Sequence, residues 1–382
     1  MEFRESAEET AFRREVQAFI EENLPSAMRG ESPVVDEITA EGQFLSALAR
    51  QHWVAPAWPA ELGGAALSFY QQFIFNEEMA KARAPQPPGI GVGNAGSAII
   101  LHGSPEQKAR YLPGIAQGTE IWCQGFSEPG AGSDLAGLQT RAEQKGDVFL
   151  INGQKIWTSF AHVSQHILLL ARTDPSAPKH RGISAFLLDM KTPGIDVRPL
   201  VDMSGEHRFN QVYFEDVVAP REALLGELNR GWTYARSTLE VERSGVRGVV
   251  TIQQVLDEFT RAARERSSGL SNPWRAALVD RHIEVQISRM MALRVVTLQS
   301  EGKSPTHEAS CNSLFSGELA QRVGMLGMQI YGMHAQAHET FATLSRAAKH
   351  FYLRTQSSTI RGGTKEIQRN VIAVRGLGMP RA

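Results

Sequence analysis

The feature that most restricts the fold of this chain is a change of hydrophobic period from helical to strand-like and back to helical. Up to about residue 118, apolar residues recur at spacings of three and four, as on one face of an amphipathic helix. Between residues 121 and 226, short apolar runs are separated by Gly, Asn, Asp and Pro, which is typical of β-strands and turns. From residue 231 onwards, long helical periods return. This order predicts a β domain between two helical domains.

Several elements can be located within this pattern. Ser104 is an N-cap residue followed by Pro105, and the helix that they begin is expected to end at Gly118. Earlier helices are expected within FRREVQAFIEENL, DEITAEGQFLSALARQH and LSFYQQFIFNEEMAKAR. Strands are expected within KGDVFLINGQKIWTSF, SQHILLLARTD, GISAFLLDM, GIDVRPL and NQVYFEDVVAP, and one more just before residue 126.

Length and charge narrow the class of protein. A chain of 382 residues exceeds one ordinary domain, so we place an N-terminal helical domain at 1–119, a central β domain at 120–228 and a helical bundle at 229–382. The 40 basic residues balance the 41 acidic ones, with a net charge of −1. Neither a nucleic-acid-binding surface nor an acidic tail is therefore indicated.

Cysteine usage and hydropathy indicate the compartment. Cys123 and Cys311 are too few and too far apart for a disulfide framework or a Cys-x-x-Cys site. The first residues are charged and amphipathic, and apolar runs such as 167–171 are too short to span a bilayer. We expect a soluble protein in a reducing cytoplasm.

An acidic residue interrupts an apolar stripe in the segment WTYARSTLEVERSGVRGVVTIQQVL. The stripe consists of Trp232, Ala235, Leu239, Glu242, Val246, Val249 and Leu256, and it predicts one helix with a buried face. Glu240 has Arg236 and Arg243 within side-chain reach, whereas Glu242 has no cation at the corresponding positions. A buried, unpaired carboxyl group has a raised pKa. Glu242 therefore either pairs with a distant residue or takes up a proton.

The segment GVGNAG, residues 91–96, matches the Gly spacing of a dinucleotide-binding turn. That motif needs a preceding central strand, and the preceding APQPPGI is too rich in proline to be one. We favour a loop that opens a helix over a nucleotide site.

Two histidine pairs have a spacing of four residues, His162 with His166 and His334 with His338. Neither has the His-Glu-x-x-His form, and His162 lies beside an expected strand. Ordinary surface or core histidines are favoured over metal ligands, so no metal site is predicted.

The segment FSEPGAGSD, residues 126–134, is a more specific signal. Its small residues and turn formers follow a strand and expose backbone N–H groups and the hydroxyls of Ser127 and Ser133. The later segment QKIWTSF adds Trp157 as an apolar wall, with Thr158 next to it as a hydrogen-bonding residue. A planar polar ligand fits both segments, whereas a tight turn alone does not explain the second.

The segment IRGGTKEIQRN places two glycines before another helical run. Gly363 and Thr364 lie where a helix N-terminus can receive an anion or a carbonyl oxygen. By itself the segment favours an ordinary N-cap over a ligand site.

Together, FSEPGAGSD, GDVFLINGQKIWTS, LEVERSG and GGTKEIQRNVIAVRGLG resemble the acyl-CoA dehydrogenase family in order and spacing over essentially the whole chain. The resemblance implies an α+β multidomain fold with an N-terminal helical domain, a central β-barrel or sandwich domain and a C-terminal four-helix bundle. It also implies FAD, held between the β domain and the bundle.

Carried onto matching positions, the resemblance implies a set of site residues. The cofactor-binding residues are Phe126, Ser127, Gly132, Ser133, Trp157, Thr158, Ser159, Thr364 and Glu366, with the Ser159 hydroxyl near flavin N5. The substrate-binding residues are Ser133, Arg243 and Gly363.

The reaction that the resemblance implies removes a proton from the α carbon of an acyl-CoA thioester while a hydride leaves the β carbon for flavin N5. The product is a trans-2-enoyl-CoA. Many members carry the base just before the Gly-Thr of the last motif, where this chain has Gly362. Others, such as the isovaleryl and long-chain types, carry it at the position of Glu242. Glu242 then acts as the base, and the Gly362 N–H polarises the thioester carbonyl together with a flavin ribityl hydroxyl.

The resemblance also implies partners. Family members are commonly tetramers, dimers of dimers, and electron-transfer flavoprotein is the expected electron acceptor. Two motifs that grip FAD across the subunit interface are altered here, reading ARERSSGLSNPW and GMLGMQIYGMHA. Such forms resemble a bacterial subgroup that degrades bulky or dicarboxylic acyl chains, as in fatty acid or sterol side-chain β-oxidation, with some α₂β₂ pairs. Two alternatives stay open: a non-catalytic or half-site subunit, and a flavin monooxygenase-type or nitroalkane-oxidising relative.

Overall fold

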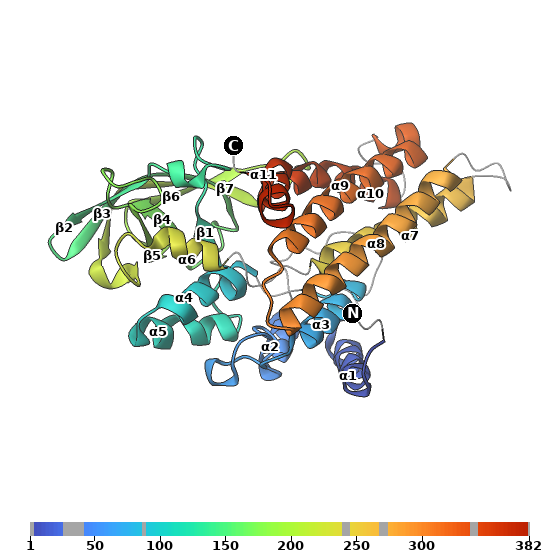
Figure 1. Cartoon of the computed structure of the whole chain (residues 1–382), viewed down its shortest axis with the longest axis horizontal. Helices are drawn as coiled ribbons and strands as arrows, with labels where there is room; N and C mark the ends of the chain where they lie inside the picture. The colour runs from blue at the N-terminus through green and yellow to red at the C-terminus, as the bar shows by residue number, and fades with distance from the viewer. Residues whose placement is uncertain are drawn as a thin grey trace. The chain divides into compact units, whose positions relative to one another are not determined.

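The computed structural model describes residues 4–25, 42–85, 89–238, 245–266, 274–336 and 343–380 (Figure 1). By packing, the chain divides into two compact units. Unit 1 consists of Met1–Thr39, Leu67–Pro85 and Arg243–Ala382. Unit 2 consists of Ala40–Ala66 and Gln86–Glu242. Each unit therefore contains helices from the N-terminal part of the sequence. The domain boundaries that we place after residues 119 and 228 stay a prediction.

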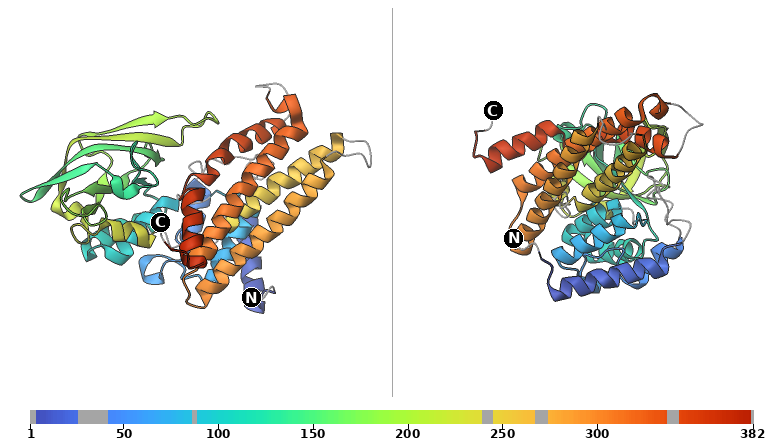
Figure 2. Two further views of the ribbon diagram at one scale, coloured as in Figure 1. Left: turned by 45° about the horizontal axis from the view of Figure 1, so that its top comes forward. Right: turned by 90° about the vertical axis from the view of Figure 1, so that its right-hand side faces the viewer.

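Unit 1 is helical. Its helices are α1 (Ala7–Asn23), α3 (Phe69–Lys81), α7 (Val246–Arg266), α8 (Arg275–Ser300), α9 (Thr306–Tyr331), α10 (Thr343–Thr355) and α11 (Lys365–Val371). Helices α7 to α10 run alongside one another, and α9 packs on the other three (Figure 2). Their core contains Leu256 and Phe259 of α7 with Leu319 and Val323 of α9. Gly327 allows the close approach, since a Cβ there would lie 2.4 Å from the Phe259 ring.

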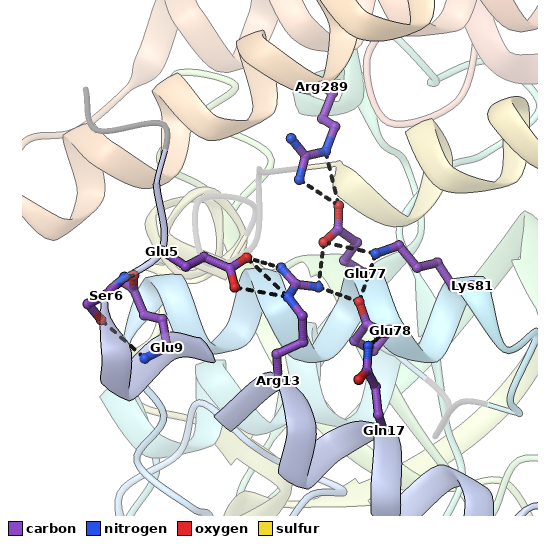
Figure 3. Close-up of polar contacts among 9 residues, drawn as sticks. All are labelled: Glu5, Ser6, Glu9, Arg13, Gln17, Glu77, Glu78, Lys81 and Arg289. Atoms are coloured by element: carbon purple, nitrogen blue, oxygen red, sulfur yellow. Dashed lines mark hydrogen bonds and ion pairs between the residues drawn. The ribbon is translucent and has the colours of Figure 1, made fainter. Parts of the chain in front are cut away.

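Buried charges join three helices of unit 1 (Figure 3). Arg13 of α1 pairs with Glu77 and Glu78 of α3, and its nitrogen lies 2.7 Å from Glu77 Oε2. Arg289 of α8 binds the other oxygen of Glu77 at 2.9 Å, and Lys81 lies 3.4 Å away. Burial alone would raise the pKa of Glu77, but Arg289, Lys81 and Arg13 outweigh it, so its pKa is lowered. Glu77 is therefore a charged anchor between α1, α3 and α8.

Unit 2 combines a sheet with helices. The helices are α2 (Gly42–Arg50), α4 (Ser97–His102), α5 (Pro105–Ala116) and α6 (Gly231–Thr238). The strands are β1 (Trp122–Gly125), β2 (Arg141–Lys145), β3 (Val148–Ser159), β4 (His166–Arg172), β5 (Ile183–Asp189), β6 (Ile195–Leu200), β7 (Phe209–Pro220) and β8 (Leu224–Leu225). The sheet order is β6-β7-β3-β2-β4-β5-β8, and β1 pairs with β4 in parallel.

The central strand β4 is buried on both faces, because successive side chains point to opposite sides of a strand. Leu168 and Leu170 belong to a core with helices α4, α5 and α6, which lie against this face (Figure 1). Ile167 and Leu169 belong to a second core with the side chains of β3 and β7. One face of the sheet is thus covered by helices, and the other packs against side chains of β3 and β7.

The helix–sheet–helix order predicted from the sequence is confirmed. The strands predicted at β3, β4, β5, β6 and β7 are all present, and α5 begins at Ser104 with a capping box. Strands β2 and β8 were not predicted from the pattern; β2 is mostly exposed and β8 has only two residues. Among the described residues, no helix is both long and apolar enough to cross a membrane. Both cysteines are free.

Two sequence predictions are wrong. GVGNAG is not a loop: it lies in a π-helix, Ile90–Gly96, that continues into α4. The stripe from Trp232 to Leu256 is not one helix, because Gly245 between α6 and α7 has a left-handed φ of 64°. Glu242 falls outside the described residues.

We expect Glu77→Ala to lower the free energy of unfolding by about 1–3 kcal/mol, since it removes a buried carboxylate that binds Arg13 and Arg289. Arg13 keeps its pair with Glu78, and Arg289 is partly exposed. Glu301→Ala is the matched control, because its ion pair with Lys303 is exposed, and we expect it to stay close to wild type. Urea unfolding followed by circular dichroism measures both. Equal stability of the two variants would show that the buried anchor is dispensable.

The same carboxylate makes unit 1 sensitive to acid. A lowered pKa in the folded state contributes stability that is complete above the unfolded value of about 4.3. This contribution is lost as pH falls through the folded value. We therefore expect Glu77→Gln to reduce the acid dependence of unfolding between about pH 5 and 3, measured by urea titration at each pH.

Candidate functional site

The candidate site of unit 2 lies where the loop Phe126–Asp134 meets the end of β3. The backbone N–H of Ile156 donates to the Ser127 carbonyl at 2.9 Å. The loop contains a tight turn, in which Glu128 and Ala131 exchange backbone hydrogen bonds of 3.0 Å. The two segments that the sequence suggested as walls of one ligand site are therefore in contact.

A buried ion pair holds this loop to β3. Lys155 Nζ lies 2.8 Å from Glu128 Oε1 and donates to the Phe126 carbonyl at 3.1 Å. The Glu128 carboxylate also accepts from the backbone N–H groups of Gln139 at 2.7 Å and Thr140 at 2.8 Å. The Lys155 side chain is 0% exposed. One lysine thus ties together the start of the loop, its turn and the strand.

The pair remains charged at neutral pH. Burial lowers the pKa of Lys155 to about 8, against the opposing attraction of Glu128. Burial would raise the pKa of Glu128, but Lys155 and the N–H donors have the larger effect, so the pKa is lowered. Removing one member would leave the other as an uncompensated buried charge.

The far end of the loop makes an exposed ion pair. Both oxygens of Asp134 lie 2.9 Å from Lys179 Nζ. Lys179 belongs to the connection between β4 and β5, and Arg172 donates to its carbonyl at 3.3 Å. Gly130, Gly132 and Ser133 lie between this surface contact and the buried Glu128, and all three are exposed.

The end of β3 has a strained backbone. Trp157 and Phe160 have φ values of 60° and 61°, and the register with β7 shifts between Lys155 and Thr158. Such conformations cost roughly 1–3 kcal/mol each and persist only where the surroundings impose them. Here the buried Asn210 of β7 donates to the Thr158 carbonyl at 3.0 Å, and Phe160 N donates to Arg208 O at 2.9 Å. As a result, the residue Trp157 is 56% exposed.

Thr158 carries a hydroxyl whose hydrogen bond is missing. Its side chain is buried, yet Oγ1 has no hydrogen-bond partner among the described residues. A buried hydroxyl without a partner is costly, so a native structure usually has a reason for one. Thr158 is 0% exposed, so a ligand at the end of β3 would complete this hydrogen bond only if it displaced the groups that cover Oγ1.

In unit 1, a second group of sequence-predicted residues lies on one turn. Gly362 and Gly363 have left-handed φ values of 66° and 103°, and Thr364 caps α11 by accepting from Ile367 N at 3.3 Å. Gln368 Nε2 lies 3.4 Å from the Gly362 carbonyl and 3.3 Å from that of Gly363. The Gln368 amide therefore contacts the carbonyls of both glycines. Glu366 is exposed on the first turn of α11.

The structure thus brings the predicted cofactor residues of the β domain together and puts the remaining ones on the Gly362–Glu366 turn. The Phe126 ring belongs to the core with α4 and α5, which leaves only its backbone for a ligand. Glu242 and Arg243 lie outside the described residues. The sequence analysis missed Lys155 and Glu128. The sequence did indicate such a pair. Lys155 lies at the same alternate positions of the strand as the inward-facing Phe149 and Ile151, and a charge on that face needs a buried partner.

The histidine pairs have other surroundings. The His162 ring stacks on His207 at 4.0 Å, and His166 is buried against Tyr111 and Trp122. His338 is not described. Within the described part of the chain, no group of three or more His, Cys, Asp or Glu side chains is placed to hold a metal ion.

Comparison with known proteins agrees with this architecture. Three family models match: acyl-CoA dehydrogenase N-terminal domain at residues 6–119, middle domain at 123–217 and C-terminal domain at 229–377. Acyl-CoA dehydrogenase IpdE1 of Mycobacterium tuberculosis is 36% identical over 97% of both chains. The structure titled Tcur3481-Tcur3483 steroid ACAD has a TM-score of 0.88 at 29% identity and covers 100% of both chains. The ChsE4-ChsE5 complex from Mycobacterium tuberculosis has a TM-score of 0.86 at 30% identity and also covers 100% of both.

The chain belongs to the acyl-CoA dehydrogenase family. Members of this family are FAD-dependent oxidoreductases that act on acyl-CoA, so this family assignment confirms the predicted enzyme class and cofactor. The predicted fold of N-terminal helices, a central sheet domain and a C-terminal helical region is confirmed as well.

The residues of unit 2 fit a flavin. An isoalloxazine ring is planar, with polar atoms on its edge, and it needs an apolar surface beside hydrogen-bonding groups. Trp157 offers an exposed aromatic surface next to the unpartnered Thr158 hydroxyl and the Ser159 hydroxyl. The anchored loop adds the hydroxyls of Ser127 and Ser133.

We expect Lys155→Met to destabilise unit 2 by about 3–5 kcal/mol and to lower the FAD content of the purified protein, because Glu128 is left buried and unpaired. Lys145→Met is the matched control on the neighbouring strand, since its pair with Glu143 is exposed. Thermal unfolding and the ratio of flavin to protein absorbance measure the two effects. A Lys155 variant with normal flavin content would remove the pair from the site.

We expect Thr158→Val to weaken FAD binding about tenfold, the loss of one hydrogen bond, without destabilising the apoprotein. The apoprotein should even gain slightly, because Val removes an unpartnered hydroxyl. Thr158→Ser keeps the hydroxyl and should keep the affinity. Quenching of FAD fluorescence on titration with apoprotein measures the dissociation constants, and unchanged binding by the Val variant would contradict a role for Oγ1.

Proposed function

We propose that this protein dehydrogenates an acyl-CoA thioester to the trans-2-enoyl-CoA, with Glu242 as the base that removes the α proton. Bound FAD supplies the acceptor for the hydride that leaves the β carbon. The Gly362 N–H donates to the thioester carbonyl and stabilises the negative charge that develops there. Gly363 and Arg243 contact the substrate, together with Ser133.

The observation that carries this proposal is the arrangement at the end of β3. The exposed Trp157 ring and the unpartnered Thr158 hydroxyl lie beside a loop that Lys155 and Glu128 fix in place. Membership of the family across the N-terminal, middle and C-terminal domains supports the same chemistry. The choice of Glu242 rests on the sequence, because relatives carry the base at this position and Gly362 replaces the alternative glutamate.

The backbone of the Gly362 turn suits its proposed role. Left-handed φ values at Gly362 and Gly363 turn the chain sharply, and a Cβ at Gly362 would meet nothing within 4 Å. Backbone N–H groups on such a turn are accessible to a ligand oxygen. The carbonyls of the same turn are near the Gln368 amide, so a fixed geometry precedes substrate binding.

The substrate class and partners belong to this proposal. A bulky acyl chain, such as a sterol side chain, is favoured because a steroid ACAD is among the similar structures. We infer that the protein works as a homotetramer or homodimer, or as an α₂β₂ pair with a related subunit, and passes electrons to electron-transfer flavoprotein. A cytoplasmic location, inferred from cysteine usage, also stays a prediction.

A half-site subunit is the second candidate, because two of the similar structures are titled as pairs of chains. In that case the protein would bind FAD only with its partner. The altered FAD-gripping segments GMLGMQIYGMHA and ARERSSGLSNPW favour the same possibility. The flavin monooxygenase-type alternative has no specific support in the described residues.

The decisive experiment adds a panel of acyl-CoAs anaerobically to the FAD-loaded protein and follows flavin bleaching. We expect Glu242→Gln to slow bleaching by a factor of about 10²–10⁴, the usual contribution of a general base. Glu240→Gln is the matched control two residues away, because Glu240 has arginines within helical reach. It should bleach at the wild-type rate.

Each other outcome has a clear meaning. Equal bleaching by both variants would move the base to another residue. Bleaching only after addition of a second, related chain would support the half-site candidate. Oxygen-dependent product formation without anaerobic bleaching would support the monooxygenase-type alternative.

A further inference from the structure

Two histidines contact a buried asparagine where β3 ends. Asn210 of β7 is 0% exposed and pairs in register with Thr158 of β3. The Asn210 Nδ2 atom lies 3.0 Å from the Thr158 carbonyl and 3.2 Å from His162 Nδ1. Its Oδ1 atom lies 2.8 Å from His207 Nε2. The two imidazole rings stack with their centres 4.0 Å apart. One amide group thus joins strand β3 to both imidazoles.

Hydrogen-bond chemistry fixes the orientation of this amide and the positions of the protons around it. A carbonyl oxygen can only accept, so the Asn210 atom that faces the Thr158 carbonyl must be the nitrogen. The second N–H of the amide is then donated to His162 Nδ1, which must be an acceptor without a proton. The amide oxygen accepts from His207 Nε2, which must carry a proton. One arrangement of protons therefore satisfies the whole network.

The two histidines respond differently to an added proton. On His207 the proton goes to Nδ1, because Nε2 already carries one, and the bond to Asn210 stays. On His162 the proton goes to Nδ1, so the acceptor of the Asn210 amide becomes a donor. Two donors then face each other, and turning the amide over would bring its oxygen against the Thr158 carbonyl. The network therefore requires His162 without a proton on Nδ1.

The charged groups beside His162 come from the connection between β6 and β7. His207 stacks on it, and Arg208 forms an ion pair with Glu206. The turn that carries His162, residues 160–165, contains no other titratable side chain in its sequence. The opposite charges of Arg208 and Glu206 offset one another, whereas a cationic His207 repels a second proton on the stacked ring. The stacked pair therefore holds one positive charge more readily than two.

We propose that the two histidines, through Asn210, position the segment 157–159 for FAD, and that protonation of His162 releases this segment. They are positioning residues, because Asn210 acts on the backbone of the segment. The inference rests on the proposed place of Trp157 and Ser159 at the flavin.

Backbone strain at the end of β3 gives this contact its effect. The left-handed φ of 60° at Trp157 persists only while the surroundings impose it. The Asn210 bond to the Thr158 carbonyl, one residue later, is one of these constraints. Loss of this bond lets the backbone relax, so the Trp157 ring and the Ser159 hydroxyl leave the positions that suit a planar ligand.

The release of FAD at mildly acid pH tests the proposal. We expect the wild-type protein to bind FAD about tenfold more weakly at about pH 5.5 than at about pH 7.5, the interval in which histidine side chains change charge. His162→Asn places an amide oxygen near the position of Nδ1, an acceptor that takes up no proton at these pH values. We expect its affinity to change less than about twofold over the same interval. Dilution of the FAD-loaded protein and the fluorescence of the released flavin measure both affinities.

Two further variants serve as controls. His52→Asn changes an exposed histidine with a left-handed φ of 58°, which asparagine tolerates, and it should keep the acid loss of wild type. His207→Gln keeps a donor near the position of Nε2 and should also keep the acid loss. Circular dichroism confirms that each variant is folded. An acid loss that His207→Gln abolishes and His162→Asn retains would overturn the assignment to His162.

Hydrogen exchange distinguishes failure of this inference from failure of the proposed flavin site. We expect residues 156–160 of the protein with excess FAD to exchange faster at acid pH, after correction for the intrinsic effect of pH, and His162→Asn to abolish this increase. Exchange that does not respond to acid would overturn the proposal and leave the flavin site intact. Acid-dependent exchange with unchanged release of FAD would overturn the place of this segment at the flavin.

Discussion

The ion pair between Lys155 and Glu128 is the interaction on which the candidate site depends. Neither side chain is stable there alone, because burial of a lone ammonium or carboxylate group costs several kcal/mol. Together they satisfy one another and bind the carbonyl of Phe126 and the N–H groups of Gln139 and Thr140. A loop rich in glycine and serine would otherwise have many conformations. The pair selects one of them and attaches it to the strand that carries Trp157.

The same constraint explains how β3 can end in a strained conformation. Trp157 and Phe160 have backbone angles that an isolated strand would avoid. Lys155 fixes the chain before Trp157, and Asn210 fixes it between Trp157 and Phe160 through the Thr158 carbonyl. The strain turns an aromatic side chain outwards and leaves a hydroxyl without a partner. Both features are unfavourable in an empty protein and useful in one that binds a planar cofactor.

Much of this could be predicted from the sequence, and the exceptions have physical causes. Strands β3 to β7 were predictable because their apolar runs are bounded by turn formers, and α5 because Ser104 and Pro105 mark its start. The partnership of Lys155 with Glu128 was not, since 27 residues separate them and only the fold brings them together. The break was missed because the apolar stripe continues from α6 to α7, although Gly245, directly before α7, has a left-handed φ. The site residues on the loop and at the end of β3 were found because each group lies in one short segment of the sequence. The residues that hold them in place come from segments far apart in the sequence.

The composition of the two units has a consequence for how the protein is made. Unit 1 is assembled from the two ends of the sequence and a short piece between residues 67 and 85, while unit 2 fills the intervals. Helices α1 and α3 leave the ribosome long before Arg289, the residue of α8 that neutralises Glu77. Unit 1 can therefore be completed only after the final third of the chain is synthesised. By then the whole sequence of unit 2 has already been made. No single cut in the gene can release either unit as a whole, and a chain truncated before α8 would leave Glu77 with only Arg13 and Lys81 as its cations.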